Sequence, residues 1–538
     1  MLGAVLRVGA LTYFTGAIDT EAAEYARIAE NLLAGNGYRG IVTPGVELMF
    51  PPLYPLLIAA TAAAVKDADV AARIVCLIFG SLLPLAMYGV ASRLYDRNTS
   101  LWVAAAGAFH PLLVSISAWT YSEALYITLV IVGLYLVMGC MRNERASQFV
   151  FAGIAFGAAY LTRPEGFILP FVGGLFIAVA QWKTIRMVAP RIGILIGTFL
   201  TIAAPYMVFV SHHSGGFRLE GKTPINFEMT RRVLNGEDYL EVVYGVGANL
   251  EGTGIWMRSN SDVIRTAKLS SRDLGRIMLK AGKNFGKLIE MLCRAPFGTP
   301  LLLFLAVLGL FGRPWTGETR GMQLLLISVV GVTAASLLTT IFADNSRYAW
   351  FYVPVLLIWA VRGGQYLGEW TIATIDGGGR WADAARWICP AVGPACLVVM
   401  FAASAMTVDD PVSGRGRESL PTKVAGLWLR RNRAGPVTVM DSQTNLAFHA
   451  GAEFVYIPNG SGEIILSYAD AKKVDFIVIR PAHPWVVGRK VLEEWGRKGL
   501  EHPRAELVYA SRGSPSQELF IYRWKPQSRH EAAGGKGT

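Results

Sequence analysis

Apolar runs of about 20 residues recur along most of this chain, and few folds can accommodate them. A backbone in hydrocarbon must satisfy its own hydrogen bonds, so each run is expected to form a helix that spans a bilayer. The chain is 53% hydrophobic and 17% charged, whereas soluble domains carry about 25% charged residues. We therefore expect a polytopic α-helical membrane protein. The candidate spans lie at about 71–91, 99–116, 122–141, 149–168, 167–182, 192–211, 297–312, 322–343, 349–364 and 388–407.

The N-terminal stretch 1–14 is apolar but shorter than a full span. It lacks the basic start and the small-residue cleavage site of a signal peptide, so a clipped or shallow first helix is expected instead. This helix brings the expected number of transmembrane helices to about eleven.

Basic residues indicate which side of the membrane each loop faces. The turn at 116–122 carries no charge, whereas the loops that lead to the opposite side are basic. By the positive-inside rule the basic loops are cytoplasmic, so residues 18–65, residues 212–296 and the tail from 408 are expected outside the cytoplasmic membrane. The basic loop residues are Arg93, Arg97, Arg142, Arg145, Lys183, Arg186, Arg191, Arg313 and Arg320.

The net charge of +12 does not indicate a nucleic-acid partner, because the basic residues are scattered between apolar runs. They fit loop anchors and contacts with anionic membrane lipids. The five cysteines lie in or beside apolar segments without Cys-x-x-Cys spacing, so neither a disulfide framework nor a zinc site is expected.

The tail has a different pattern. Residues 420–431 have helical spacing, and short β-rich runs alternate with helical stretches beyond them. We predict a membrane domain over 1–407, a small extracytoplasmic α/β domain over 408–526 and a disordered end at 527–538. The predicted strands are 437–440, 454–457, 475–479, 507–509 and 519–522.

Carboxylates stand directly after the first apolar stretch. Glu21, Glu24 and Tyr25 fall on one flank of an amphipathic helix that follows Asp19. The same pattern is compatible with Asp19 as a helix cap and with the acidic residues as a solvated helix start, since the helix dipole favours them there. The alternative is a carboxylate that acts at the membrane edge.

Two further carboxylates lie near aromatic residues. Glu47 precedes a proline-rich turn with Tyr54, which fits either an interfacial pocket or an aromatic belt. Glu123 opens an apolar helix, where dipole complementarity alone would explain it.

Charged residues are also held between apolar runs. Arg163 and Glu165 have almost no loop around them, and at a membrane boundary such residues are costly unless they are paired or used. Arg347 and Tyr348 join two apolar helices, and the planar Arg fork suits a phosphate. Lys222 adds a further cation in the long loop.

Carboxylates and cations on one face suit a particular reaction. A carboxylate can take the proton of an attacking hydroxyl or amine, and cations can stabilise a departing phosphate. The donor is then expected to be a membrane lipid that carries an activated group.

The ordered set of motifs resembles the GT-C glycosyltransferases, in the bacterial branch related to protein mannosyltransferases and the lipid A aminoarabinose transferase. The resemblance covers roughly residues 5–365, and an extracytoplasmic tail occurs in many relatives. The matching segments are Asp19–Tyr38, Phe50–Pro55, Ser122–Glu123, Leu161–Glu165 and Ser346–Tyr348.

The resemblance implies an inverting transferase that uses a polyprenyl-phosphate sugar. It implies a catalytic acid residue, usually Asp, four residues before Tyr25, where this chain has Glu21; Asp19 lies two residues earlier, and we favour it slightly on its shorter side chain. It also implies that Arg347 and Arg163 contact the lipid phosphate. Some relatives need a divalent metal, but no dense acidic cluster here requires one.

Two other classes of function remain open. A transporter or lipid flippase predicts inverted repeats and charges near the midplane, and neither is evident in the sequence. A structural or assembly protein is compatible with a tail that shows no catalytic signature. The acceptor could be a lipid, a polysaccharide or a protein, and neither it nor the sugar can be inferred from the sequence.

Overall fold

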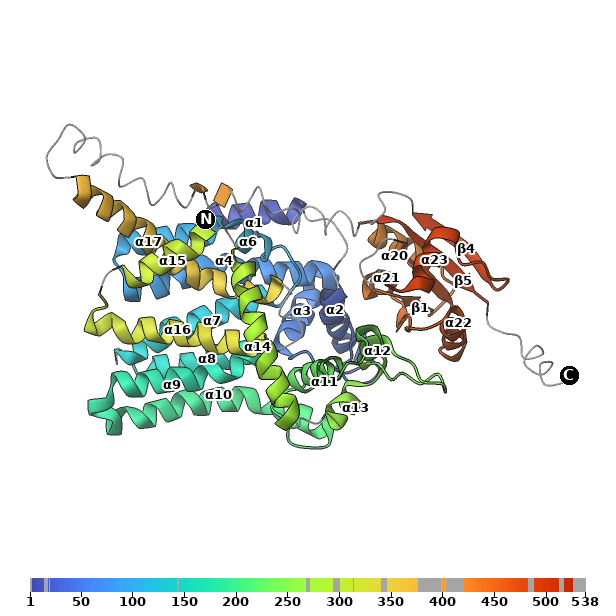
Figure 1. Cartoon of the computed structure of the whole chain (residues 1–538), viewed down its shortest axis with the longest axis horizontal. Coiled ribbons are helices and arrows are strands. Elements are labelled where there is room, and N and C mark those ends of the chain that lie inside the picture. Colours follow the sequence, from blue (N-terminus) through green and yellow to red (C-terminus); the bar gives the residue numbers. More distant parts are fainter. Residues whose placement is uncertain are drawn as a thin grey trace.

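A computed structural model shows a helical bundle and, at one end of it, a separate sheet domain (Figure 1). The predicted fold class, a polytopic helical protein with a C-terminal α/β domain, is confirmed. The structure describes residues 2–13, 18, 20–142, 145–267, 271–293, 300–312, 314–339, 346–375, 398–399, 401–402, 420–481, 488–511 and 517–525.

The bundle is built from apolar helices that mostly run parallel or antiparallel in Figure 1. The segments α4, α7, Trp182–Ser214 (a short 3-10 turn continued by α10) and α16 are long and apolar enough to cross a membrane. The bundle helices are α1 (Leu2–Tyr13), α3 (Leu53–Val65), α4 (Ala68–Leu94), α5 (Arg97–Phe109), α6 (Pro111–Ser115), α7 (Glu123–Met141), α8 (Ser147–Tyr160), α9 (Leu169–Ala180), α10 (Ile185–Ser214), α15 (Pro300–Phe311), α16 (Gly317–Leu338) and α17 (Tyr352–Ile375).

Shorter apolar helices account for most of the remaining predicted spans, so the number of crossings stays a prediction. The run at 388–407 lies almost wholly outside the described residues. Residues 53–65, which the sequence analysis placed in an amphipathic loop, form the apolar helix α3 against α2 (Thr20–Leu33) and α4.

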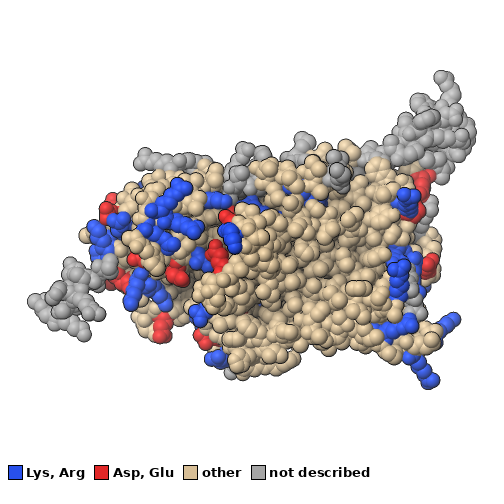
Figure 2. All heavy atoms as spheres, turned by 180° about the vertical axis from the view of Figure 1, so that it is seen from behind, with Lys and Arg blue, Asp and Glu red and all other residues tan. Residues whose placement is uncertain are grey.

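The helix α7 lies at the centre of the bundle. Of its apolar stretch 78% is buried inside the protein, against 22% for the stretch that contains α10. The outer surface of the bundle is almost uncharged over a broad face, and Lys and Arg gather at the end away from the sheet domain (Figure 2). The orientation that the positive-inside rule assigns to this basic end stays a prediction.

The opposite end of the bundle carries the amphipathic and polar elements. They are α2, the 3-10 turn η1 (Pro164–Ile168), α11 (Lys222–Leu234), α12 (Tyr239–Tyr244), the turn η3 (Ile255–Met257), α13 (Asn260–Thr266), α14 (Ser271–Leu292) and the turn η4 (Ser346–Ala349). In Figure 1 they lie between the bundle and the sheet domain or across the helix ends.

The sheet domain has five strands in the order β2-β1-β3-β5-β4. The first three strands are parallel, and β5 joins them antiparallel to β3 and β4. All five predicted strands are present, whereas the end predicted to be disordered lies outside the described residues. The elements are α20 (Leu420–Asn432), β1 (Thr438–Asp441), α21 (Thr444–Ala450), β2 (Glu453–Tyr456), α22 (Gly462–Ala471), β3 (Phe476–Ile479), α23 (Lys490–Lys498), β4 (Ala505–Ser511) and β5 (Leu519–Trp524).

Glycines allow α15 and α17 to approach backbone to backbone. A Cβ added to Gly309 would lie 1.8 Å from the Trp359 carbonyl oxygen, and one added to Gly363 would lie 1.9 Å from the Leu305 carbonyl oxygen. Backbone atoms cannot rotate away, so the contact tolerates no side chain. This packing fixes α17, whose first turn follows η4.

We expect Gly363→Ala to destabilise the protein by about 1–3 kcal/mol, because the two helices must separate to accept the methyl group. The measurement is thermal unfolding in detergent. Gly193→Ala in α10 is the matched control, since a Cβ there meets nothing within 4 Å. Equal unfolding temperatures for the two variants would contradict the close packing.

Candidate active site

Arg347 lies between two carboxylates from distant parts of the chain. Its Nη1 and Nη2 donate to the two oxygens of Glu21 at 2.5 and 2.9 Å. Its Nε and Nη2 donate to the two oxygens of Glu123 at 2.5 and 3.1 Å. The guanidinium thus makes two bidentate ion pairs, the strongest form of this interaction.

The ion pairs continue on the other side of Glu123. Arg163 Nη1 donates to Glu123 Oε1 at 2.7 Å, and its Nη2 donates to Glu165 Oε1 at 3.3 Å. Lys222 Nζ reaches the same Glu165 oxygen at 3.3 Å. The side chains form one chain of alternating sign, which we call the charge chain: Glu21, Arg347, Glu123, Arg163, Glu165 and Lys222.

The six members of the charge chain come from five local structures, and Arg163 and Glu165 share one of them, η1. Glu21 and Glu123 stand in the first turns of α2 and α7, where the helix dipole stabilises a negative charge. Arg163 immediately precedes the proline that starts η1, and Arg347 lies in η4. Lys222 is the first residue of α11. The charged side chains lie together at one end of the bundle because the helices and turns that carry them begin there.

Aromatic rings complete the surroundings of the cations. The Arg347 guanidinium lies 3.9 Å from the centre of the Tyr121 ring. Tyr348 lies 5.7 Å from both Arg163 and Lys222, measured from ring centre to charge. Cation–π contacts of this kind stabilise partly desolvated cations. The Tyr25 hydroxyl donates to Glu21 Oε1 at 3.1 Å.

Glu21 is ionised in this arrangement. Burial alone would raise the pKa of its carboxyl, but attraction to Arg347, with smaller contributions from Lys222 and Arg163, lowers the pKa to about 2. The carboxylate remains 29% exposed, more than any other member of the charge chain.

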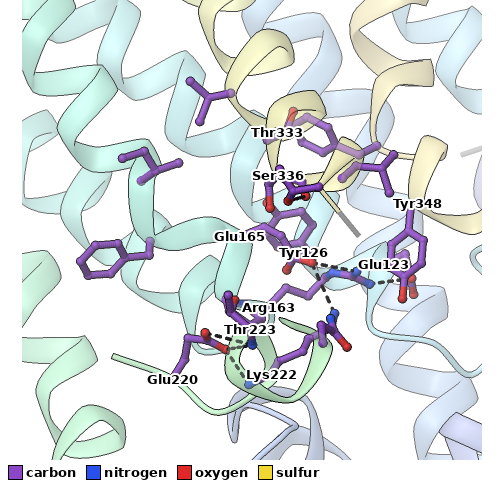
Figure 3. Close-up of a pocket in the computed structure, with 18 of the residues that line it drawn as sticks. Glu123, Tyr126, Arg163, Glu165, Glu220, Lys222, Thr223, Thr333, Ser336 and Tyr348 are labelled. Carbon is purple, nitrogen blue, oxygen red and sulfur yellow. Dashed lines mark hydrogen bonds and ion pairs between the residues drawn. The ribbon is translucent and has the colours of Figure 1, made fainter. Parts of the chain in front are cut away.

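A cavity of about 430 Å³ opens beside the charge chain (Figure 3). Glu123, Arg163, Glu165, Lys222 and Arg347 line its polar end. Apolar and aromatic side chains line the rest, and hydroxyl groups are added by Thr223, Thr333, Ser336 and Thr339. The cavity can therefore hold a molecule with a charged head and an apolar body.

Glu24 and Glu47 do not join the charge chain. Glu24 Oε2 accepts from the backbone N–H groups of Ile41 and Val42 at 2.8 Å each. Glu47 Oε1 accepts from Met49 N at 2.6 Å and from Asn260 Nδ2 at 2.7 Å. Both side chains are fully buried and fix the loop after α2.

Burial and the neighbouring Glu47 carboxylate raise the pKa of the Glu24 carboxyl well above 4.5, so the folded protein favours its protonated form. Burial also raises the pKa of Glu47. Glu24 Oε1 has no hydrogen-bond partner among the described residues apart from this neighbour, with which it can share the proton. The pair therefore has a structural position behind the site.

The remaining predicted positions lie outside the charge chain or outside the described residues. Tyr54 is buried, contacts the Cys76 thiol at 3.1 Å and packs its ring 4.9 Å from that of Tyr25, the residue whose hydroxyl donates to Glu21. Asp19 lies outside the described residues. Two further cations of α11 that the sequence analysis does not select, Arg231 and Arg232, pair locally with Glu228 and Glu237.

The sequence analysis did not select Tyr121, Tyr126 or Glu220 as site residues. Tyr121 lies under Arg347, and Tyr126 and Glu220 line the cavity. The only signal in the sequence that could have indicated them is that two of them stand close to predicted site residues. Tyr121 is two residues before Glu123, and Glu220 is two residues before Lys222. In the part of the chain that is described, no cluster of three or more His, Cys, Asp or Glu side chains could hold a metal ion.

Comparison with known proteins identifies the fold. A family model described as dolichyl-phosphate-mannose-protein mannosyltransferase matches residues 50–209. ArnT from Cupriavidus metallidurans, solved with bound undecaprenyl phosphate, superposes with a TM-score of 0.55 at 13% identity, over 98% of each chain. No curated protein matches the sequence significantly.

A second solved structure agrees. AglB from Archaeoglobus fulgidus, an oligosaccharyltransferase in complex with an inhibitory peptide and a dolichol-phosphate, gives a TM-score of 0.52 at 13% identity, over 88% of this chain and 69% of that chain. The chain therefore has the GT-C glycosyltransferase fold, and the resemblance inferred from its ordered motifs is confirmed.

The raised pKa of Glu24 predicts how the stability of the protein depends on pH. An unfolded chain ionises this carboxyl above pH 4.5, whereas the folded protein binds the proton more tightly, so stability should fall as pH rises from 4.5 toward the raised pKa. Glu24→Gln keeps a neutral group there and should flatten this slope by up to about 1.4 kcal/mol per pH unit. The measurement is denaturant unfolding in detergent between pH 5 and 8.

The control is Glu237→Gln, which removes an exposed carboxylate from a loop at the same end of the bundle. An unchanged slope in Glu24→Gln, matching that control, would show that Glu24 is ionised in the folded state.

Proposed function

We propose that this protein is an inverting glycosyltransferase. It moves a sugar from a polyprenyl-phosphate donor to an acceptor of the cell envelope, at the outer face of the cytoplasmic membrane. The observation that carries the proposal is the contact between Arg347, which lines the polar end of the cavity, and Glu21, a partly exposed carboxylate that stands behind this Arg and does not itself line the cavity.

The donor fits the two ends of the cavity. The polar end supplies Lys222 and Arg347 for a phosphate, and the apolar lining accommodates the first isoprene units of a lipid. ArnT and AglB were solved with undecaprenyl phosphate and dolichol-phosphate, respectively, which supports a lipid phosphate as the donor group here.

Glu21 is the proposed general base. The acceptor hydroxyl or amine attacks the anomeric carbon of the sugar, and Glu21 takes the acceptor's proton. The bond between that carbon and the phosphate oxygen breaks, and polyprenyl phosphate departs with the electron pair. One displacement inverts the anomeric centre. Asp19 is the alternative base, and Glu21 is preferred because it contacts Arg347.

Arg347 gives this base a way to respond to the donor. In the ligand-free arrangement its fork holds Glu21 and lowers the pKa of that carboxyl. A phosphate that takes part of the fork would weaken this attraction, so the pKa of Glu21 would rise toward its usual value. A carboxylate is a better base at that higher pKa. Donor binding would therefore activate Glu21.

The remaining members of the charge chain hold the cations in place. Glu123 lies between Arg347 and Arg163, so it separates two positive charges that would otherwise repel each other. Arg163 and Lys222 add positive potential at the position of the leaving phosphate. Electrostatic stabilisation of this kind is often the largest part of catalysis.

We expect Glu21→Gln to reduce sugar transfer by about 10²–10⁴-fold, the usual contribution of a general base. Arg347→Lys should also reduce transfer strongly, because an ammonium group cannot hold phosphate and Glu123 with one planar fork. The assay follows label from a polyprenyl-phosphate sugar into envelope material of a strain that lacks the protein, with Asp19→Asn tested in parallel.

Glu237→Gln serves as the matched carboxylate control and should retain full activity, since it lies at the surface in a local ion pair. Undiminished transfer by the Glu21→Gln, Asp19→Asn double variant would exclude both proposed bases. Uptake of a labelled lipid into proteoliposomes without covalent transfer would favour the flippase alternative instead.

A further inference from the structure

The helix α14 has three distinct sides. Its Ile277, Asn284 and Leu288 side chains are buried against the protein. Asn284 Nδ2 donates to the Leu338 carbonyl at the end of α16 at 2.8 Å. The helix also contacts η4 and α11, so it lies against three elements that line the cavity.

A second side of α14 is apolar and exposed. Met278, Phe285 and Ile289 are 63%, 55% and 42% exposed. At 3.6 residues per turn these three side chains fall within about 40° of one another, beside the buried side. Large apolar side chains gathered in this way indicate an apolar surrounding rather than water.

A third side is basic. The side chains at positions 276, 280, 283 and 287 are all Arg or Lys, and they lie within about 60° of each other, opposite the exposed apolar side. Arg276 and Lys283 are exposed. A helix with one apolar and one basic side has the pattern of a helix at a membrane surface.

The position of α14 agrees with this pattern. Figure 1 shows it crossing the bundle helices at a steep angle, at the end that carries the charge chain. A helix that runs across the ends of membrane-spanning helices lies in the plane of the bilayer.

We propose that α14 binds the surface of the lipid bilayer. Met278, Phe285 and Ile289 enter the acyl region, and the basic side contacts anionic lipid headgroups. The partner is the membrane itself, and the contact holds one wall of the cavity at headgroup depth. This inference does not depend on the reaction that the cavity supports.

The test uses spin labels at two positions of the full-length protein in nanodiscs with anionic lipid, after replacement of the native cysteines. A label at Phe285→Cys should collide mainly with oxygen, which concentrates in hydrocarbon. A label at Lys283→Cys should collide mainly with a water-soluble nickel chelate. Equal access of the chelate to both labels would overturn the proposal.

A charge test separates headgroup contact from apolar insertion. Raising the anionic lipid fraction should move the label at 285 deeper, and Lys283→Glu together with Arg276→Glu should reduce that shift by at least half. A label depth that ignores lipid charge would overturn the assignment to anionic headgroups.

A different observation concerns the sheet domain, and this second inference rests on the role proposed for Glu21. The hydroxyl of Thr444, fully buried at the start of α21, donates to the carbonyl of Thr20 at 3.1 Å. Thr20 is the residue before Glu21 at the start of α2. Arg27 further along α2 lies 5.9 Å from the centre of the Phe448 ring of α21.

Further contacts fix the sheet domain in place. Lys423 of α20 pairs with Asp69 of α4 at 3.1 Å. The Asn459 backbone N–H donates to the Tyr244 carbonyl of α12 at 2.9 Å, and Arg489 lies 5.3 Å from the Tyr244 ring centre. The domain is thus attached on several sides of α2, and the contact at Thr20 is held firmly.

We infer that Thr444 is a positioning residue for Glu21. By fixing the first turn of α2 it sets the place of the Glu21 backbone, and hence the approach of its carboxylate to the acceptor. A displacement of about 1 Å can cost up to 10²-fold in rate. A domain without catalytic groups would in this way control the chemistry.

The experiment measures transfer kinetics for Thr444→Val, Thr444→Ser and Thr422→Val. Thr444→Val should lower kcat about tenfold with little change in the KM for the donor, and Thr444→Ser should restore it. Thr422→Val removes a hydroxyl that accepts from Arg480 inside the same domain at 2.9 Å, so it controls for general destabilisation.

Equal losses in Thr444→Val and Thr422→Val would overturn the positioning role, and so would an unchanged kcat in Thr444→Val. Glu21→Gln is measured beside them. If it loses activity while Thr444→Val does not, only the positioning inference fails. If Glu21→Gln keeps full activity, the proposed base itself fails.

Discussion

The double ion pair of Arg347 with Glu21 and Glu123 is the constraint on which the end of the bundle next to the sheet domain depends. Removing a charge from water costs several kcal/mol, and this cost is offset only when partners of opposite sign are close and well oriented. Here α2, α7 and η4 must all meet at one place to supply them. The ion pairs therefore define where these elements end relative to one another, and they leave a cation beside an open cavity.

Different parts of the protein hold the residues that surround these ion pairs. Glu123 is held by the bundle because it opens α7, the most buried of the four candidate membrane spans found among the described residues. The loop behind α2 is fixed by Glu24 and Glu47, which accept backbone N–H groups instead of joining the charge chain. The sheet domain contacts α2 from the other side, and α14 lies against the cavity wall. The bundle, the loop after α2, the sheet domain and α14 each restrict the motion of a different part of the same site.

Sequence reasoning succeeded where a local physical rule decides the outcome. Apolar length predicted α4, α7, α10 and α16, and short alternating β-rich runs predicted the five strands. The cost of a charge at a membrane boundary singled out Arg163 and Glu165, which are indeed paired. Helical spacing alone did not separate Glu21 from Glu24, which are three residues apart on one flank, and only the family resemblance assigned Glu21 to the catalytic slot. Their partners come from residues 41–42 and from Arg347, and spacing within α2 contains no information about either.

The amino-acid sequence by itself determined that the chain forms a membrane bundle with an α/β tail. Long apolar runs, and short β-rich runs that alternate with helical stretches, are local properties that can be recognised without the fold. It also determined which charged groups stand at helix starts and loop ends. Only the tertiary structure decided that six of them join in one chain of alternating sign, and that Glu24 and Glu47 lie apart. Contacts between residues hundreds of positions apart depend on how helices pack, and no local pattern records that packing.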